Sequence, residues 1–202
     1  MINLDFKKSF FIAEIGVNHN GDINLAKKMI RAAKESGADA VKFQTFDANL
    51  LVNKKASKVE YQLKNTNKNE SHFEMIKNLE LSKSNHYELK DFCEKIKISF
   101  LSTPYDIESA RFLNDDLNIS IFKTASADII DIPLQKFIAS TSKPCLISIG
   151  MANLKEIEDV FKIYRNRENF NIAFLHCVSN YPSSDKSLNL NVISSIKKYF
   201  KV

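Results

Sequence analysis

A repeated unit constrains the fold of this chain more than any other feature of its sequence. A short apolar run followed by an amphipathic stretch recurs about every 25 to 45 residues. The apolar runs are rich in valine, isoleucine and phenylalanine, which favour strands, and alternation with helical stretches is typical of βα units with parallel strands. Six units are visible, with predicted strands over residues 10–16, 40–45, 98–103, 120–126, 144–150 and 172–178.

The stretches between these runs predict helices. Asp22 is placed to cap a helix that runs to about residue 36, and Gly37 follows it as a stop signal. The polar segment 47–71, after the second strand, predicts a functional loop or lid. Further helices are predicted near residues 84–97, 106–115, 153–168 and 189–200.

Alternating units fit either an open doubly wound sheet or a (β/α)8 barrel. A doubly wound nucleotide domain usually has a glycine-rich phosphate turn after its first strand, and the sequence EIGVNHNG at that point has none. Nearly every predicted strand ends instead in a polar or ionisable residue, and in a barrel these ends converge on one mouth. We therefore predict an α/β fold of the (β/α)8 TIM-barrel type, with about six of the eight βα units in this chain.

The composition of the chain argues against membrane and nucleic-acid partners. No apolar stretch approaches the roughly 20 residues that a membrane-spanning helix needs, and the amino terminus lacks a signal-peptide pattern, so we expect a cytoplasmic protein. The formal net charge of +5 is spread over lysines that alternate with acids. This pattern argues against a nucleic-acid partner and suits an anionic substrate. The three widely spaced cysteines are expected to be buried apolar residues.

Two lysines stand inside predicted strands, where a charge is costly unless it meets a partner or a ligand. They are Lys42 in AVKFQT and Lys123 in IFKTAS. Either one alone could pair with a carboxylate such as Glu14. Two lysines with the strand-end hydroxyls of Ser102, Thr103, Ser126 and Ser148 fit a small dianionic ligand better.

Two carboxylates are predicted to flank this anion site. Glu14 is interpreted as a base or hydroxyl acceptor, with a structural salt bridge as the alternative. Asp128, which precedes Pro133, is either functional or a helix cap.

The histidines indicate a functional role less clearly than the two carboxylates do. His176 and Cys177 make no recognisable metal-ligand set. His19 could lie in a loop at the same mouth, whereas His72 and His86 are expected to be exposed.

Six motifs occur in order at successive strand ends: EIGVNHNG, ADAVKFQT, FLSTPYD, FKTASAD, ISIGMA and LHCVSNYP. With them the chain resembles the sialic acid synthase family, which includes N-acetylneuraminate, legionaminate and pseudaminate synthases, over roughly residues 8 to 190. The resemblance implies a TIM barrel followed by a small antifreeze-like domain. Residues 1–202 would then be the barrel domain, incomplete at its C-terminus and without the antifreeze-like domain.

The resemblance also implies roles for individual residues. Glu14 and Asp128 would be catalytic, although many bacterial members have glutamate at the position of Asp128. Gln44, Tyr181 and Asn67 would contact the sugar. Phosphoenolpyruvate would be held by Lys42, Thr103, Lys123, Ser126, Ser148 and Ser179.

The implied reaction condenses phosphoenolpyruvate with an N-acetylated amino-sugar aldehyde, such as N-acetylmannosamine, to give a nine-carbon sugar acid and phosphate. The family uses a divalent metal, typically manganese, whose histidine ligands are expected after Val202, so no metal ligand is predicted in residues 1–202 and this chain alone is expected to be inactive. The family forms homodimers, which are not expected of residues 1–202 alone. Two alternatives stay open: a truncated, non-catalytic phosphoenolpyruvate-binding protein, and a Schiff-base keto-acid aldolase with Lys42 or Lys123 as nucleophile.

Overall fold

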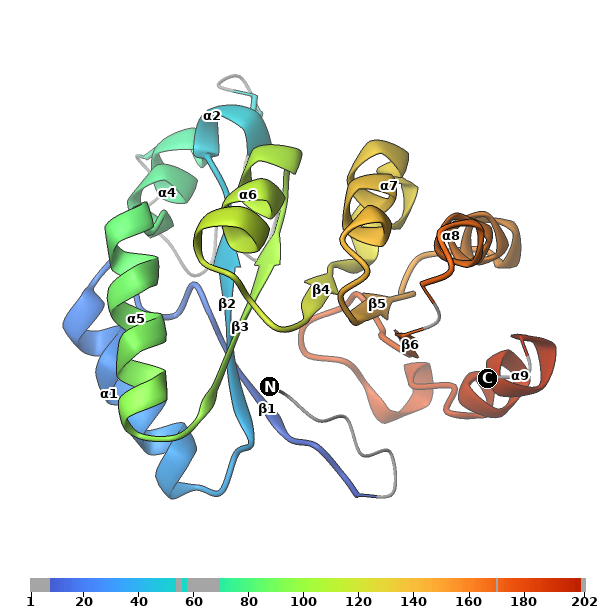
Figure 1. Ribbon diagram of the computed structural model, residues 1–202, viewed down its shortest axis with the longest axis horizontal. Helices are drawn as coiled ribbons and strands as arrows, with labels where there is room; N and C mark the ends of the chain where they lie inside the picture. Colours follow the sequence, from blue (N-terminus) through green and yellow to red (C-terminus); the bar gives the residue numbers. More distant parts are fainter. Residues whose placement is uncertain (1–7, 54–55, 58–69, 170, 201–202) are drawn as a thin grey trace. The chain divides into compact units, whose positions relative to one another are not determined.

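The protein is an α/β structure with parallel strands (Figure 1). The computed structural model describes residues 8–53, 56–57, 70–169 and 171–200. The chain divides into two compact units, Met1–Ser120 and Ile121–Val202. Each unit contains a three-stranded sheet with its own helices.

The sheet of the first unit has the order β1-β2-β3, and both neighbouring pairs are parallel. Its register places Glu14 beside Lys42 and Gln44 beside Thr103. Because parallel strands end at the same edge, these residues gather at one end of the sheet. The strands are β1 (Ile12–Gly16), β2 (Ala40–Thr45) and β3 (Ser99–Pro104).

The helices of the first unit begin with capping residues that the sequence supplies. Asp22 caps α1 by accepting hydrogen bonds from the backbone N–H groups of Asn24 and Leu25, as predicted. In Figure 1, α1 and α5 run side by side along the sheet. The helices are α1 (Ile23–Glu35), α2 (Ala48–Leu51), α4 (His72–Leu79), α5 (Lys83–Lys95) and α6 (Ile107–Arg111), followed by the π-helical turn η1 (Phe112–Asp116).

The central strand β2 lies in the core of this unit. Phe43 on β2 is fully buried and stacks on Phe100 of β3, with ring centroids 5.5 Å apart. Ile30 of α1 and Leu89 of α5 are also fully buried. The apolar stripes of two helices therefore pack against the sheet and hold the strand ends in place.

The second unit repeats the arrangement with the order β4-β5-β6, again parallel. Its strands are β4 (Phe122–Thr124), β5 (Cys145–Ser148) and β6 (Ile172–Leu175). Its helices are the 3₁₀ helix η2 (Ser126–Ile130), α7 (Ile132–Ser140), α8 (Leu154–Asn166), the 3₁₀ helix η3 (Asp185–Ser187) and α9 (Asn191–Phe200).

The core of the second unit contains a large buried tyrosine. Tyr164 of α8 is completely buried, and its hydroxyl donates a hydrogen bond to Gln135 Oε1 of α7 at 3.0 Å. Phe122, Ile138 and Ile147 are also fully buried. This packing fixes α7 and α8, which contact one another, over the short strand β5.

The six predicted strands and their parallel pairing are confirmed. The helix expected over residues 106–115 is shorter, because a π-helical turn begins at Phe112. Helices α2, α4 and α7 were not predicted. No closed barrel is formed by the residues that the structure describes, and within them no helix is long and apolar enough to cross a membrane.

Candidate functional site

The first unit brings together four of the predicted site residues at the carboxyl ends of its strands. Lys42 Nζ lies 2.5 Å from Glu14 Oε2 and 3.1 Å from Thr103 Oγ1. Lys42 is only 7% exposed, whereas the side chain of Glu14 is 51% exposed. The carboxylate partner considered for Lys42 is therefore present, and Glu14 remains open to solvent and to a ligand.

Gly16 shapes the same cluster. It has a φ of +55°, and a Cβ at this position would lie 3.1 Å from Glu14 Oε1 and 3.6 Å from Gln44 Nε2. The carboxylate of Glu14 and the amide of Gln44 therefore both approach a residue without a side chain. Gln44 joins Glu14, Lys42 and Thr103 as the sequence predicted.

The second unit places two predicted serines at Gly150 and a third beside Cys177. A Cβ on Gly150 would lie 2.7 Å from Ser179 Oγ, 2.8 Å from Ser126 Oγ and 2.9 Å from the carbonyl oxygen of Cys177. The thiol of Cys177 donates a hydrogen bond to Ser148 Oγ at 3.4 Å. The segments after β4 and β6 thus bring two hydroxyl groups to Gly150, and the end of β5 brings a third to Cys177, a set of donors suited to anionic oxygens.

Asp128, in η2, has an unusual electrostatic environment. Its Oδ2 atom is buried and has no hydrogen-bond partner among the described residues. Burial raises the pKa of Asp128 to about 6, the charge of Asp131 adds to the rise, and the charge of Lys123 opposes it. A carboxyl group with this pKa exchanges its proton near neutral pH.

The alternative that Asp128 caps a helix is wrong. Asp131 caps α7, since its Oδ1 accepts a hydrogen bond from the backbone N–H of Leu134 at 3.0 Å. The carboxylate of Asp128 is therefore available for another role.

The remaining predicted residues have different surroundings. Tyr181 follows β6 and is 83% exposed, so its ring is accessible to a ligand. Asn67 lies outside the described residues. Lys123 lies on β4 and is half-buried. Lys42 and Lys123 belong to separate units, and their sharing of one ligand stays a prediction.

The described residues contain no group of three or more histidine, cysteine, aspartate or glutamate side chains that could hold a metal ion. His176 Nε2 lies 2.6 Å from the carbonyl oxygen of Leu188, an acceptor, and therefore donates to it. These side chains do not fit a manganese site, and the expectation of manganese rests on the family resemblance alone.

Cysteine surroundings agree only in part with expectation. Cys93 and Cys145 are completely buried, and burial raises the pKa of each thiol to about 12. Cys177 is half-buried instead, and its thiol contacts Ser148. All three cysteines are free thiols.

The expectation that His86 is exposed is wrong. His86 is 1% exposed and bonds to Thr45 on β2 and to the carbonyl of Ser82. His19, in the turn after β1, is equally buried and its Nδ1 accepts a hydrogen bond from the N–H of Gly21. Thr45, the hydroxyl partner of His86, lies 41 residues away in the sequence, so no local pattern around His86 indicates this contact.

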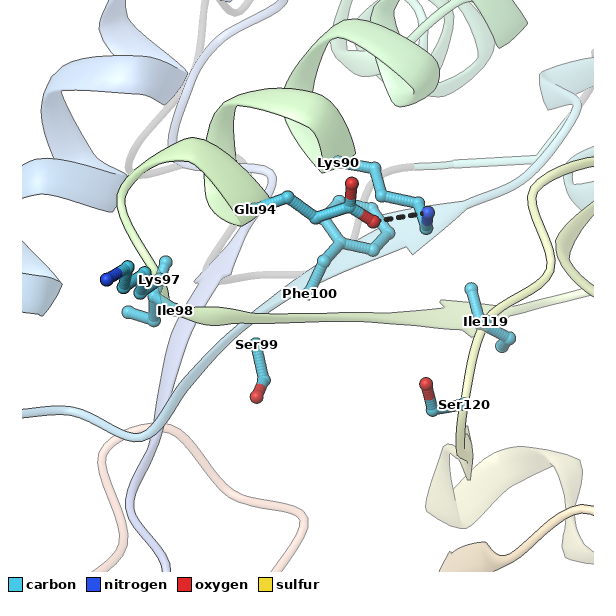
Figure 2. Close-up of a pocket in the computed structure, with 8 residues that line it drawn as sticks. All are labelled: Lys90, Glu94, Lys97, Ile98, Ser99, Phe100, Ile119 and Ser120. Carbon is cyan, nitrogen blue, oxygen red and sulfur yellow. Dashed lines mark hydrogen bonds and ion pairs between the residues drawn. The ribbon is translucent and has the colours of Figure 1, made fainter. Parts of the chain in front are cut away.

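A hollow of about 260 Å³ lies at the amino end of β3. Figure 2 shows Lys90 and Glu94 of α5 on one side of it, joined by an ion pair of 2.6 Å. Lys97 and Ser99 also line it. None of the predicted site residues is among its lining residues, and Thr103 lies toward the other end of the same strand.

Parallel βα units with lysine, hydroxyl and carboxylate side chains at their strand ends place this chain in the α/β class. A model of the NeuB family matches residues 29–202. The chain belongs to this family, the sialic acid synthase family.

Individual relatives agree with this assignment. N,N'-diacetyllegionaminic acid synthase from Campylobacter jejuni is 46% identical over 198 residues, which are 97% of this chain and 59% of that protein. The synthase of the same name from Legionella pneumophila is 44% identical, over 96% of this chain and 55% of that protein. The chain thus spans somewhat more than half the length of these curated relatives.

A solved structure is similar over nearly the same region. N-acetylneuraminic acid (sialic acid) synthetase from Leptospira borgpetersenii, crystallised in complex with citrate, is 32% identical with a TM-score of 0.80. The similarity covers 94% of this chain and 61% of that one.

Proposed function

We propose that this protein condenses phosphoenolpyruvate with an N-acetylated amino-sugar aldehyde to give a nine-carbon sugar acid and phosphate. The observation that carries the proposal is the gathering of Ser126, Ser148 and Ser179 around Gly150 and Cys177, in the unit that also contains Lys123. The names of the relatives, which are synthases of nine-carbon sugar acids, support it.

Two groups of side chains would hold phosphoenolpyruvate. In the second unit the serine hydroxyls and the ammonium of Lys123 would donate charge-assisted hydrogen bonds to phosphate and carboxylate oxygens. In the first unit Lys42, held by Thr103, would supply a second positive charge. Removing such a buried charged donor costs about 1.5 to 3 kcal/mol of binding free energy.

We propose that the two groups meet in a (β/α)8 barrel to which the six parallel strands belong. The support is the regular alternation of strands and helices and the polar residues at the strand ends. In such a barrel the carboxyl ends of all strands face one mouth, and both lysines would reach the same ligand.

The carboxylates and the remaining polar residues would serve the sugar and the proton transfers. Glu14, with Gln44, would accept hydrogen bonds from sugar hydroxyls, and Tyr181 and Asn67 would contribute further contacts. As C3 of phosphoenolpyruvate bonds to the aldehyde carbon, the aldehyde oxygen gains a proton. Water then adds at C2, and the C2–O bond to phosphate breaks.

Asp128 is the candidate acid and base for these transfers, because its raised pKa of about 6 keeps both protonation states populated near neutral pH. The use of a divalent metal, typically manganese, stays an expectation from the family resemblance, and none of the roles proposed for these residues depends on it.

The binding step is tested by titrating the chain with phosphoenolpyruvate, with Ser148→Ala as the variant that removes one donor. Saturable binding that the variant weakens supports the site, and equal binding by both proteins contradicts it. The condensation step is tested in protein purified from its natural source, by phosphate release from phosphoenolpyruvate in the presence of N-acetylmannosamine and manganese.

The same measurements separate the alternatives. Binding without sugar-dependent phosphate release favours a non-catalytic phosphoenolpyruvate-binding protein. Borohydride trapping of pyruvate on Lys42 or Lys123 would indicate a Schiff-base aldolase. The ion pair between Lys42 and Glu14 speaks against Lys42 as the nucleophile of an aldolase, because an amine nucleophile must be uncharged.

A further inference from the structure

A buried chain of hydrogen bonds links α5 to the ends of β2 and β3. Thr45 Oγ1 lies 2.8 Å from His86 Nε2 and 2.6 Å from Ser102 Oγ. His86 Nδ1 lies 2.9 Å from the carbonyl oxygen of Ser82. Thr45, His86 and Ser102 are 6%, 1% and 0% exposed, so their polar atoms depend on one another for hydrogen bonds.

The carbonyl of Ser82, together with a neutral imidazole, assigns a direction to each of these hydrogen bonds. The carbonyl of Ser82 can only accept, so the proton of the imidazole is on Nδ1. Burial lowers the pKa of His86, against hydrogen bonds to the backbone of Ser82 and Gln44 that raise it. In a neutral ring with its proton on Nδ1, Nε2 is an acceptor. The hydroxyl of Thr45 therefore donates to Nε2 and, in turn, accepts a hydrogen bond from the hydroxyl of Ser102.

The hydrogen bonds among His86, Thr45 and Ser102 lie on the opposite face of the sheet from Lys42. Side chains alternate along a strand, so Lys42 and Gln44 share one face of β2 while Phe43 and Thr45 share the other. On β3, Thr103 bonds to Lys42 on the first face, and its neighbour Ser102 bonds to Thr45 on the second. The two hydrogen bonds thus tie the same strand ends together from both sides.

We propose that His86 is a positioning residue that, through Thr45 and Ser102, holds the ends of β2 and β3 so that Thr103 stays in hydrogen-bond contact with Lys42. The proposal rests on the proposed function for its ligand, since Lys42 and Thr103 are there assigned to phosphoenolpyruvate. An apolar residue at position 86 would fill the space, yet it would leave the hydroxyl of Thr45 buried without an acceptor.

Two substitutions at position 86 separate positioning from packing. In His86→Gln, the amide oxygen reaches the place of Nε2 and accepts from Thr45. In His86→Asn, the shorter amide reaches only the place of Nδ1, so it keeps the bond to Ser82 and loses the bond to Thr45. Both variants lose the imidazole ring and its edge-on contact with Phe112.

Three quantities are measured for each variant: the affinity for phosphoenolpyruvate by calorimetry, the NMR signal of the Lys42 ammonium group, and the midpoint of thermal unfolding. We expect His86→Asn to weaken binding about tenfold, as the loss of one hydrogen bond does, and His86→Gln to bind within about twofold of wild type. The Lys42 signal should shift in the asparagine variant and return toward its wild-type position in the glutamine variant.

A purely structural role predicts a different result. Both variants would then lose thermal stability together, while affinity and the Lys42 signal stayed unchanged, and this outcome would overturn the proposal. If wild-type protein binds no phosphoenolpyruvate, the proposed function fails, and the Lys42 signal alone decides whether His86 positions the lysine.

A second variant keeps the test valid if changes at position 86 prevent folding. Thr45→Val removes the central hydroxyl and preserves the shape of the side chain. It should shift the Lys42 signal as His86→Asn does, and an unchanged signal would count against positioning. In the wild type, nitrogen NMR should show His86 as the Nδ1–H tautomer, and the Nε2–H tautomer would contradict the order of the hydrogen bonds.

Discussion

At the scale of single residues, Asp128 makes the stability of the protein depend on pH. Its folded-state pKa of about 6 exceeds the ordinary value of 3.8. The contribution of Asp128 to the free energy of unfolding is therefore fully present below about pH 4 and is lost as the pH rises through 6. Relative to wild type, Asp128→Asn should gain on the order of 2 to 3 kcal/mol between about pH 4 and pH 7.5. Urea unfolding at the two pH values measures this, and a pH-independent difference would contradict the raised pKa.

Gly150 is the residue on which the serine cluster depends. Because an added Cβ would come within 3 Å of Ser126 Oγ, Ser179 Oγ and a backbone carbonyl, Gly150→Ala should weaken binding of phosphoenolpyruvate about tenfold or more. Gly37→Ala is the matched control, since Gly37 has a φ of +84° and open space around it. The control should lose about 1 kcal/mol of stability and keep its affinity. Equal affinities of the two variants would argue against a ligand at the serines.

The strand-end residues could be predicted from the sequence because a charge in an apolar strand is conspicuous. Lys42 was found this way, and its partners Glu14 and Thr103 followed from their own strand ends. The buried position of His86 was missed, because its hydroxyl partner lies on a strand that is distant in the sequence. A single histidine in a predicted helix does not indicate such a partner. The cap of α7 was missed as well, because Asp128 and Asp131 both precede Pro133 and only backbone geometry distinguishes them.

At the scale of secondary-structure elements, α8 depends on a capping box. The side chain of Asn153 accepts a hydrogen bond from the N–H of Glu156, and the carboxylate of Glu156 accepts one from the N–H of Asn153. Asn153→Ala should lower the free energy of unfolding by about 1 kcal/mol, whereas Asn153→Ser should retain most of it. Chemical denaturation of the three proteins tests this, and equal losses in both variants would show that the cap contributes little.

Strands were predicted more reliably than helices, because the apolar run that marks a strand is contained within a few consecutive residues. The apolar runs of β2, β3 and β5 form strands whose side chains are almost all buried, as expected of parallel strands covered on both faces of the sheet. Helix α4 was hidden because its capping box, Ser71 and Glu74, stands at the end of a polar segment that was interpreted as one loop. Two parts of that segment, residues 54–55 and 58–69, lie outside the described structure, so its predicted role as a lid stays a prediction.

At the scale of the whole molecule, the repeated βα unit correctly predicted an α/β structure with parallel strands, and the match to the NeuB family confirms the resemblance that the six motifs indicated. The division into two units leaves the barrel as a proposal. Periodicity could not decide this point, because the same local units build both open sheets and barrels.

The most direct test of the central claim is a calorimetric titration of the chain with phosphoenolpyruvate. Wild-type protein should bind one molecule per chain, and Lys42→Met and Lys123→Met should each weaken binding by roughly 10- to 100-fold. Lys97→Met is the matched control, because Lys97 is exposed and lines the hollow at the amino end of β3. Its affinity should equal that of wild type. No binding by the wild type, or an equal loss in the Lys97 variant, would contradict a phosphoenolpyruvate site at the strand ends.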